Sequence, residues 1–520
     1  MRILLVTGQL AKETVREYSK DFDNVSVMDL PIAVASLMKP SYIIRQLKSR
    51  EIKGYDVILT SGLIEGDLKE VEKELGIKTY KGSKHASDIP LLLQYLEKIE
   101  LSSKIAADEL IKEELKRRAL EEIEEVERKS EELVKKEGNF KIEGLALGKD
   151  FPIRIMAEIV DAPKLTDEEL KRRALYYYNS GARIIDIGMI ANEERINDAY
   201  RCVKAVKQVI DCPISIDSMN PEEIKKGIEA GASIVLSLDG GNAEKLSSLA
   251  DRAWFVVIPT NFDKNYFPKG LEERVKALED NVRLAKSLGF KKILADLILD
   301  PFFSPNFTES LISYHLFSKR NPNIPLLMGV GNLTELTDTD TLGMNVILAG
   351  SATELNISII LTTEVSDRNK GSVRELCQAS RMMFLAKKRR TTPKGLGIDM
   401  IFIKDKKLKD ESYPRKLEKE IEVIHTNGKE EYYKADPKGC FRFYVDREKE
   451  EIIAIHYPTY KLDKPALIIK GKRALDIYRE IVKRNLVSTL DHSAYLGAEL
   501  QKAEISLKLG KSYIQDSPLF

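Results

Sequence analysis

Ile214-Ser215-Ile216-Asp217-Ser218 is a short apolar run that ends in polar residues, and two other stretches share its pattern. They are Ile184-Ile185-Asp186-Ile187-Gly188 and Leu326-Leu327-Met328-Gly329-Val330-Gly331-Asn332. Apolar runs of this length are typical of strands buried on both faces of a parallel sheet. In a closed β/α barrel, side chains at the C-terminal ends of such strands face the active-site mouth. The three stretches therefore predict an enzyme whose mouth offers carboxylates and an amide to a polar heterocycle.

The composition predicts a cytoplasmic protein without nucleic-acid partners or membrane insertion. The 83 Lys and Arg residues nearly balance the 82 Asp and Glu residues, so no basic field attracts nucleic acid. Four scattered cysteines form no C-x-x-C pair, which is typical of a reduced compartment. Met1 is followed at once by an apolar strand rather than a signal-peptide pattern, and no apolar run approaches the roughly 20 residues of a membrane span. The Lys, Glu and Ile bias with a single Trp resembles the composition of hyperthermophile proteins.

Residues 150–392 alternate regularly between strand-like and helix-like segments. Eight such units over about 240 residues match the size and rhythm of a (β/α)8 TIM barrel. A doubly wound open sheet is the alternative, but eight units favour closure. The strands are expected at Ile153–Ile159, Arg183–Gly188, Ile214–Asp217, Ile234–Leu238, Phe255–Ile258, Ile293–Asp296, Leu326–Val330 and Ile359–Thr363.

The flanking regions predict two smaller domains, so the fold class is α/β with three parts. Residues 1–100 have the pattern of a small Rossmann-like α/β domain, in which Lys81-Gly82-Ser83-Lys84-His85 is either a phosphate loop or, as we favour, a solvated turn. Residues 393–520 predict an α+β domain. Its expected strands are Met400–Ile403, Glu420–His425, Cys440–Val445 and Ile452–Tyr457.

Residues 101–149 predict a long charged helix, over about 103–137, and a linker. Apolar residues recur in it at spacings of three or four and form one stripe. The helix is expected to pack along a neighbouring domain or a second subunit, so a homo-oligomer is one of the two expectations. The stripe consists of Ile111, Leu115, Ala119, Ile123 and Val126.

Polar residues gather at the predicted strand ends. Such carboxylates could ligate Mg²⁺, act as acids and bases, or accept paired hydrogen bonds from an amino-pyrimidine edge. For Asp161 and Asp300, each beside a proline, capping the next helix is an equal alternative. Asp217 and Asp296 close their strands directly, which favours function. The full set is Glu158, Asp161, Asp186, Asp217, Ser237, Asp239, Asp296, Asp300, Asn332 and Glu364.

Residues of about 150–390 resemble the pterin-binding barrel family, which includes dihydropteroate synthase and the pterin-dependent methyltransferases. Gly181–Gly188 is similar to the family's strand-two signature, and Pro213–Ser218 to its strand-three signature. Gly231–Val235 follows at the expected spacing and opens strand four. The run from Leu490 to Glu504 resembles a domain of archaeal tetrahydromethanopterin-linked proteins. The whole chain therefore looks like the archaeal proteins related to dihydropteroate synthase.

The resemblance implies roles for individual residues. It implies that Asp217, Asp296, Glu158, Ser237 and Asn345 bind a reduced pterin, with Ser237 or Leu236 where the synthases carry an asparagine. It implies catalytic roles for Asn332, Glu364 and Asp186, and assigns no residue set to a metal, although Mg²⁺ could take part. Glu158, Asn332 and Asn345 resemble positions of the methyltransferase branch. Glu364 stands where the synthases present an Arg-x-His pair to the leaving pyrophosphate, which a carboxylate would repel.

Three functions follow from these residues. The first is a transferase like dihydropteroate synthase in tetrahydromethanopterin biosynthesis, with Mg²⁺ and Arg368 or Lys370 holding pyrophosphate. The second is a methyltransferase that uses a methylated pterin. The third is a pterin carrier or assembly subunit that lacks the chemistry. In each case the partner is a small-molecule pterin.

Overall fold

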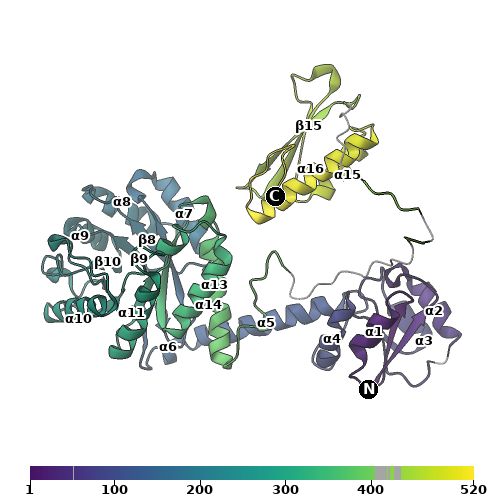
Figure 1. Cartoon of the computed structure of the whole chain (residues 1–520), viewed down its shortest axis with the longest axis horizontal. Coiled ribbons are helices and arrows are strands. Elements are labelled where there is room, and N and C mark those ends of the chain that lie inside the picture. Colours follow the sequence, from purple (N-terminus) through teal and green to yellow (C-terminus); the bar gives the residue numbers. More distant parts are fainter. Residues whose placement is uncertain (51, 405–417, 420–421, 427–434) are drawn as a thin grey trace. The chain divides into compact units, whose positions relative to one another are not determined.

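The computed structural model describes residues 1–50, 52–404, 418–419, 422–426 and 435–520. The chain divides into two compact units, Met1–Asp410 and Glu411–Phe520. The first unit contains a small α/β domain and a closed barrel, and the second contains a small α+β domain (Figure 1). The predicted fold class, a central barrel with smaller domains at both ends of the chain, is confirmed.

The N-terminal domain is a parallel sheet of four strands in the order β2-β1-β3-β4, with helices on both faces. The last strand was missed by sequence reasoning, and the solvated turn expected at residues 81–85 is wrong at its start, since Lys81, Gly82 and Ser83 are buried. The strands are β1 Ile3–Gly8, β2 Val25–Leu30, β3 Val57–Thr60 and β4 Lys78–Lys81. The helices are α1 Lys12–Ser19, α2 Pro40–Lys48, α3 Lys69–Leu75 and α4 Ile89–Tyr95.

The predicted charged helix is α5, Ala107–Arg128, followed by the short helix α6, Ser130–Leu133. Its apolar stripe packs within the chain. Ile111 belongs to the core of the N-terminal domain, while Ala119, Ile123 and Val126 pack against the barrel helix α14, Ser372–Arg389. The stripe therefore packs against neighbouring parts of the chain, as one of the two expectations had it, and the homo-oligomer stays a prediction.

The barrel consists of eight parallel strands in sequence order, and the last strand pairs with the first. They are β7 Arg154–Ile159, β8 Ile184–Gly188, β9 Ile214–Asp217, β10 Ile234–Leu238, β11 Trp254–Val257, β12 Ile293–Ala295, β13 Leu326–Gly329 and β14 Ile357–Thr363. All eight predicted strands are confirmed, with ends that differ by one or two residues.

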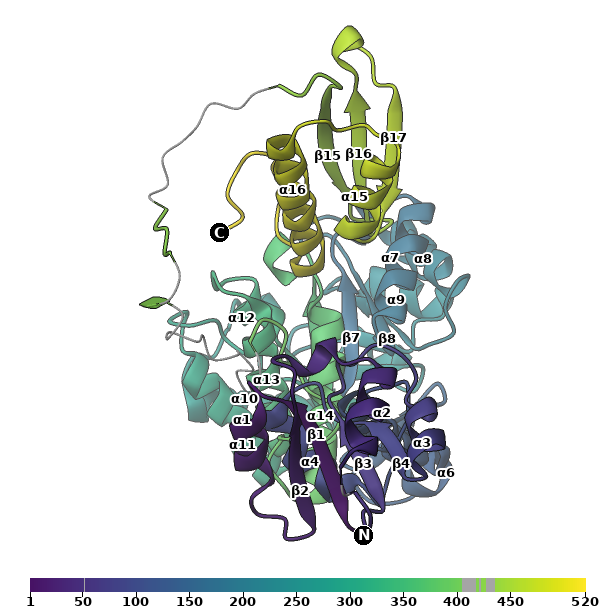
Figure 2. The same cartoon turned by 90° about the vertical axis from the view of Figure 1, so that its right-hand side faces the viewer.

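Helices cover the outside of the barrel, as Figure 2 shows for α7, α8 and α9. A capping box of Thr166 and Glu169 begins α7, and Asn220 caps α9, so polar side chains satisfy the first backbone amides. Between β10 and β11 there is only a 3-10 turn, Ser247–Leu249. The helices are α7 Asp167–Asn179, α8 Ile196–Lys207, α9 Pro221–Ala230, α10 Leu271–Ser287, α11 Phe307–Arg320, α12 Gly331–Thr334, α13 Thr341–Glu354 and α14 Ser372–Arg389.

At the N-terminal end of the strands the barrel interior is apolar, and a hairpin closes the barrel there. The strands β5, Asn139–Ile142, and β6, Leu145–Gly148, form this hairpin. Its Ile142 and Leu147 pack in one cluster with the inward residues of the strands, and the ring of Phe140 lies 4.9 Å from that of Trp254. The carboxyl groups of the interior therefore lie toward the C-terminal end of the strands, while Arg154 at the start of β7 donates to the Ala146 carbonyl of the hairpin.

The C-terminal unit is an antiparallel sheet of β15 Cys440–Asp446, β16 Glu451–Tyr457 and β17 Leu467–Gly471, covered on one face by α15 Ala474–Lys483 and α16 Leu490–Leu509. Two of the four expected strands are confirmed. Met400–Ile403 is not a strand, since it forms no ladder, and Glu420–His425 lies partly outside the described residues. In α16 the side chain of His492 is buried beside Asp436, with Nδ1 3.3 Å from Oδ2.

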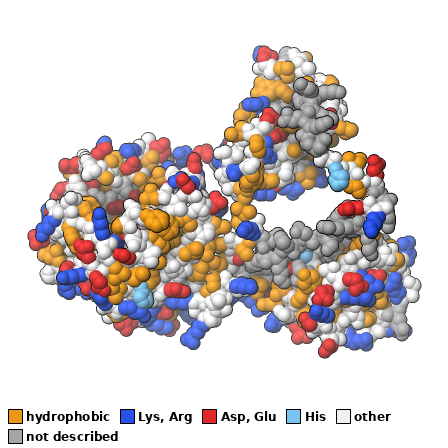
Figure 3. Space-filling model, in the orientation of Figure 1, with side chains coloured by type: hydrophobic (Ala, Val, Ile, Leu, Met, Phe, Trp, Pro, Cys, Tyr) orange, Lys and Arg blue, Asp and Glu red, His pale blue; other side chains and the backbone are white. Residues whose placement is uncertain are grey.

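The surface is mixed in charge. Figure 3 shows Asp and Glu side chains interspersed with Lys and Arg across the visible face of the barrel. In the described parts of the chain, no helix is both long and apolar enough to span a bilayer.

Candidate active site at the barrel mouth

Strand alternation decides which side chains face the inside of the barrel. In β8, Ile184 belongs to the interior cluster and Ile185 to the outer one, so Asp186 and Gly188 face inward. The same alternation turns Glu158 of β7 and Asp217 of β9 inward, since Met156 is an interior residue and Ile216 an outer one. Glu158 pairs in register with Asp186, and Gly188 with Asp217. The sequence therefore places three inward carboxyl groups on adjacent strands, with Asp217 one inward position beyond the level of Glu158 and Asp186.

These three carboxyl groups, Glu158, Asp186 and Asp217, form a cluster that we call the acidic triad. One oxygen of each lies within 4.8 Å of the others. Asp186 is fully buried, and its Oδ1 accepts a hydrogen bond of 2.5 Å from the Ser215 hydroxyl. Its Oδ2 is buried without a hydrogen-bond partner. In the described part of the chain no lysine, arginine or histidine forms an ion pair with the triad. The triad therefore has acceptors to offer and no cation of its own.

Gly188 makes room for the triad. A Cβ atom at this position would lie 2.5 Å from Oε1 of Glu158 and 3.2 Å from the Ile159 carbonyl. Only glycine lets the Glu158 carboxyl reach over the end of β8, where it meets Asp186.

The pKa values of the triad are raised because burial disfavours charge and the groups repel one another. Burial, followed by the charges of Asp186 and Asp161, raises the pKa of Glu158 to about 8. Burial raises the pKa of Asp186 to about 7, against the opposing hydrogen bond from Ser215. The pKa of Asp217 is raised well above its usual range by burial and by the charges of Asp186, Glu158 and Asp296. Burial and mutual repulsion therefore favour the protonated forms of these groups.

Asp296 is the fourth carboxyl group of the mouth and follows β12 directly. Its Oδ1 accepts hydrogen bonds from the Ile298 amide, at 2.8 Å, and from the Tyr314 hydroxyl. Burial raises its pKa to about 6, while both hydrogen bonds and the charge of Arg274 oppose the rise. Ile298 has a left-handed backbone, with φ of 63°, which is strained for a β-branched residue. Two donors on one oxygen leave Oδ2 as the acceptor for a ligand.

The acidic triad and Asp296 together form what we call the acidic layer. Two further predicted residues lie beside this layer. Asn332 begins the segment after β13, and its Nδ2 donates to the Leu299 carbonyl at 3.2 Å, on the loop that carries Asp296. Ser237 is half-buried in β10 at an irregularity in the pairing with β11, and its carbonyl accepts a hydrogen bond from Asn242. Their roles in binding or chemistry stay predictions.

Two other predicted residues lie apart from the acidic triad. Glu364 follows the inward Thr363, and it accepts hydrogen bonds from the Tyr176 hydroxyl at 3.0 Å and the Val373 amide at 2.9 Å. It therefore lies between α7 and the start of α14, and burial raises its pKa. Asn345 is buried in α13 and donates to Ser372 and Glu375 of α14. Both residues join the helices that surround the barrel.

The two aspartates with an alternative capping role form ion pairs, and their functional role stays a prediction. Asp161 pairs with Lys164 at 2.7 Å and caps no helix with its side chain. Asp300 is buried and pairs at 2.6 Å with Arg274, a buried residue of α10. Sequence reasoning missed Arg274, Tyr314 and Ser215. Ser215 had a usable signal, since it stands two residues before Asp217 and so faces inward as well.

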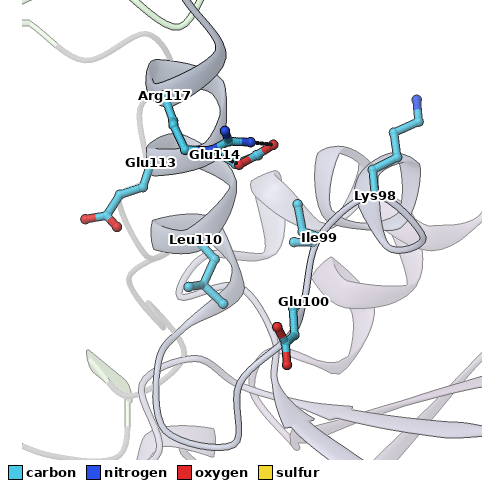
Figure 4. Close-up of a pocket in the computed structure, with 7 residues that line it drawn as sticks. All are labelled: Lys98, Ile99, Glu100, Leu110, Glu113, Glu114 and Arg117. Carbon is cyan, nitrogen blue, oxygen red and sulfur yellow. Dashed lines mark hydrogen bonds and ion pairs between the residues drawn. The ribbon is translucent and has the colours of Figure 1, made fainter. Parts of the chain in front are cut away.

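Cavities elsewhere carry fewer chemical groups. One of about 330 Å³ lies between the first half of α5 and residues 98–100, where the Arg117 side chain is bonded to Glu114 (Figure 4). Another of about 380 Å³ lies beside the β5–β6 hairpin, at the end of the barrel opposite the triad. Among the residues that the structure describes, the triad is the one group of three acidic or metal-ligating side chains whose ligand atoms all lie within reach of a common ion.

A relative defines the family of the whole chain. The chain is 41% identical over 535 residues to an uncharacterized protein of Methanocaldococcus jannaschii, covering 100% of this chain and 99% of that one. Residues 164–378, which include most of the barrel, match the family described as pterin binding enzyme. The chain belongs to the dihydropteroate synthase-related, pterin-binding proteins.

The outer parts of this pterin-binding protein match other families. Residues 435–516 match the family described as PterinBD-DUF4346, and residues 1–84 match a family of unknown function, DUF6513. The chain is also 26% identical over 167 residues to dihydropteroate synthase of Clostridium beijerinckii, covering 29% of this chain and 61% of the synthase.

The solved structures to which this pterin-binding protein is similar include dihydropteroate synthases. The Yersinia pestis enzyme with a pterine-sulfa conjugate matches with a TM-score of 0.39 at 17% identity, covering 48% of this chain and 99% of the enzyme. The Xanthomonas albilineans enzyme in complex with 7,8-dihydropteroate matches with a TM-score of 0.36 at 17% identity, covering 47% and 96%.

Proposed function

We propose that the barrel binds a reduced pterin of the tetrahydromethanopterin type at the acidic triad and Asp296 and acts on it as a transferase. The observation that carries this proposal is the acidic layer itself, with its unpartnered Asp186 oxygen and no cation of its own. Such a layer needs a ligand rich in N–H donors. The amino-pyrimidinone edge of a pterin has a ring N–H beside an exocyclic amine, and a carboxylate can accept from both.

The arrangement also supports a division of roles. Asp217 faces inward at the end of β9, and Asp296 has both of its donors on Oδ1, so these two carboxyl groups would hold the pterin edge. Glu158 and Asp186, whose pKa values lie at about 8 and about 7, would share protons with it near neutral pH. Asn332, held on the Asp296 loop, would stand beside the reacting part of the ring.

Two transferase reactions are candidates for this site. Condensation of an arylamine with a pterin pyrophosphate, in tetrahydromethanopterin biosynthesis, needs a cation for the leaving group. Arg368 and Lys370, the residues considered for this role, are engaged in ion pairs with Asp338 and Asp367. This pairing favours the second reaction, methyl transfer from a methylated tetrahydropterin, in which the leaving nitrogen of the pterin takes up a proton. A neutral carboxyl group in the mouth suits that step.

Mg²⁺ is an alternative occupant of the acidic triad. The three carboxyl groups are hard oxygen ligands at suitable mutual distance. If Mg²⁺ binds there, it would compete with the N–H donors of the pterin edge, so the two ligands can be told apart by titrating one in the presence of the other.

The test is calorimetric titration of the full chain with 6-hydroxymethyl-7,8-dihydropterin and with a 5-methyl-tetrahydropterin, with and without MgCl₂. We expect at least one pterin to bind with a dissociation constant below millimolar. Asp217→Ala should weaken binding by about 1.5–3 kcal/mol, because it removes a charge-assisted hydrogen bond. Asp211→Asn, an exposed change at the opposite end of the barrel, is the control.

Three outcomes would contradict parts of the proposal. Absence of pterin binding in the unsubstituted chain would remove the pterin assignment. Equal affinity of the Asp217→Ala and Asp211→Asn variants would remove the role of Asp217. Tight pterin binding without turnover, either of the dihydropterin pyrophosphate with an arylamine or of the methylated pterin with a methyl acceptor, would leave a pterin carrier, the non-catalytic alternative.

A further inference from the structure

The loop after β12, residues 296–300, is held from outside the barrel by two helices. From α10, the guanidinium of Arg274 donates to the Ile298 carbonyl at 2.6 Å, to the Leu297 carbonyl at 3.3 Å and to Asp300 Oδ2 at 2.6 Å. From α11, the Tyr314 hydroxyl donates to Asp296 Oδ1. Arg274 and Tyr314 are both buried, at 3% and 0% exposure. Neither residue is itself a member of the acidic layer.

These contacts determine how Asp296 is presented. The Tyr314 hydroxyl and the Ile298 amide occupy Oδ1, so Oδ2 is the oxygen left for a ligand. The Ile298 amide can point at Oδ1 because Ile298 adopts its left-handed backbone, and Arg274 holds the carbonyl of that same residue. The loop also accepts the hydrogen bond of Asn332, at the Leu299 carbonyl.

We propose that Tyr314 and Arg274 are positioning residues of the pterin site, with Tyr314 fixing the orientation and charge of Asp296 and Arg274 fixing the loop that carries Asp296 and Asn332. This inference rests on the proposed function for its ligand. It differs from that function because it assigns a role to two helix residues that do not touch the pterin.

The charge of Asp296 follows from the groups that face it. Tyr314 and the Ile298 amide favour the carboxylate, as does Arg274, while burial and the neighbouring Asp217 oppose it. Tyr314→Phe removes one donor to the carboxylate and no volume beyond a hydroxyl. The loss of this hydrogen-bond donor therefore raises the pKa of Asp296 above the value of about 6 that it has with Tyr314 in place.

The experiment measures binding of 6-hydroxymethyl-7,8-dihydropterin as a function of pH. In Tyr314→Phe we expect a 5- to 20-fold weaker affinity at pH 7, and the acid limb of the profile should move to higher pH. Ser313→Ala is the matched control, because it deletes a buried hydroxyl of the same helix that bonds only the Glu309 carbonyl. A folded Tyr314→Phe variant with an unmoved acid limb would overturn the inference while leaving pterin binding intact.

A double-mutant cycle and a ligand-free measurement complete the test. In an Asp296→Asn background, Tyr314→Phe should add no further loss, whereas a merely structural role would give the same loss in both backgrounds. Arg274→Lys keeps the charge but not the forked geometry, so it should weaken binding without moving the acid limb far. The Asp296 carboxyl can also be titrated by carbon-13 aspartate NMR of the free protein, with its signal assigned by Asp296→Asn. An unchanged titration in Tyr314→Phe would refute the inference even if no pterin bound.

Discussion

Individual residues decide whether the acidic triad can form, and Gly188 is the sharpest case. Gly188→Ala would place a methyl group 2.5 Å from the Glu158 carboxyl oxygen and displace it from Asp186. We expect weaker pterin binding by about tenfold, since one acceptor leaves the layer, with a loss of stability of about 1–3 kcal/mol from overpacking. Gly343→Ala in α13, where a Cβ atom meets nothing within 4 Å, should be neutral or stabilise by about 0.5–1 kcal/mol. Calorimetry and urea unfolding measure both; equal behaviour of the two variants would contradict the packing argument.

The protons of the triad make stability depend on pH in an unusual direction. Between an ordinary carboxyl pKa near 4 and the raised values of about 7 and 8, the folded protein holds protons that the unfolded chain has lost. The contribution of these two groups to stability is therefore fully present below about pH 4 and is lost as the pH rises toward 8. Asp186→Asn keeps the acceptor for Ser215 but removes one of these groups, so its decline between pH 5 and 8 should be smaller by on the order of 1–3 kcal/mol. Urea unfolding at both pH values checks this. A decline as steep as in the unsubstituted chain would mean that Asp186 is ionised.

The residue scale also shows what the sequence can predict about the site. Glu158, Asp186, Asp217 and Asp296 were predictable as mouth residues because they lie at or near the ends of apolar strands, and the strand period of two turns the first three inward. Glu364 shares that position in the sequence, yet Thr363 takes the inward place, so Glu364 faces the helices. Tyr314 and Arg274 belong to helices that surround the barrel. A helical pattern does not reveal which residue reaches back to a strand end, so these two required the structure.

At the scale of elements, the join between α5 and the barrel depends on a buried arginine. Arg154 of β7 donates to both oxygens of Glu127, at 2.7 and 2.9 Å, and to the Ala146 carbonyl at 2.9 Å. Glu127→Ala should destabilise the barrel by about 1–3 kcal/mol, because it leaves a buried cation with one acceptor. Glu124→Ala, on the exposed side of the same helix, should change stability by less than about 0.5 kcal/mol. Urea unfolding measures the free energy of unfolding of both variants. If both changes have a similar small effect, the packing of α5 on the barrel depends on apolar contacts and not on this ion pair.

The barrel strands were the most predictable elements, because each is an apolar run that closes on a glycine or polar residue. The β4 strand and the limits of α5 were harder. Lys78–Lys81 is polar in sequence, yet it pairs with β3 and its last residue is buried. The charged pattern continues beyond α5, but the structure breaks it at Lys129 before the short helix α6.

At the scale of the molecule, the chain consists of two compact units, and we expect a pterin to stabilise one of them. A ligand at 100 times its dissociation constant stabilises the unit that binds it by about 2.7 kcal/mol. Scanning calorimetry of the full chain should therefore show the transition of the barrel-containing unit moving upward with added pterin, while that of residues 435–520 stays in place. If both transitions moved equally, the two units would unfold as one. A transition that moved only for the C-terminal unit would place the pterin there.

The hairpin of β5 and β6 gives the barrel a single entrance. Ile142 and Leu147 close the end of the barrel away from the acidic layer, so any ligand of that layer enters and leaves through the mouth. A pterin on the triad would occupy the deeper place, and a second reactant would bind above it and block its exit. Binding would then follow a compulsory order, with the pterin first to arrive and last to depart. Product inhibition patterns in steady-state kinetics should display that order, and dead-end complexes should form when the second reactant is in excess.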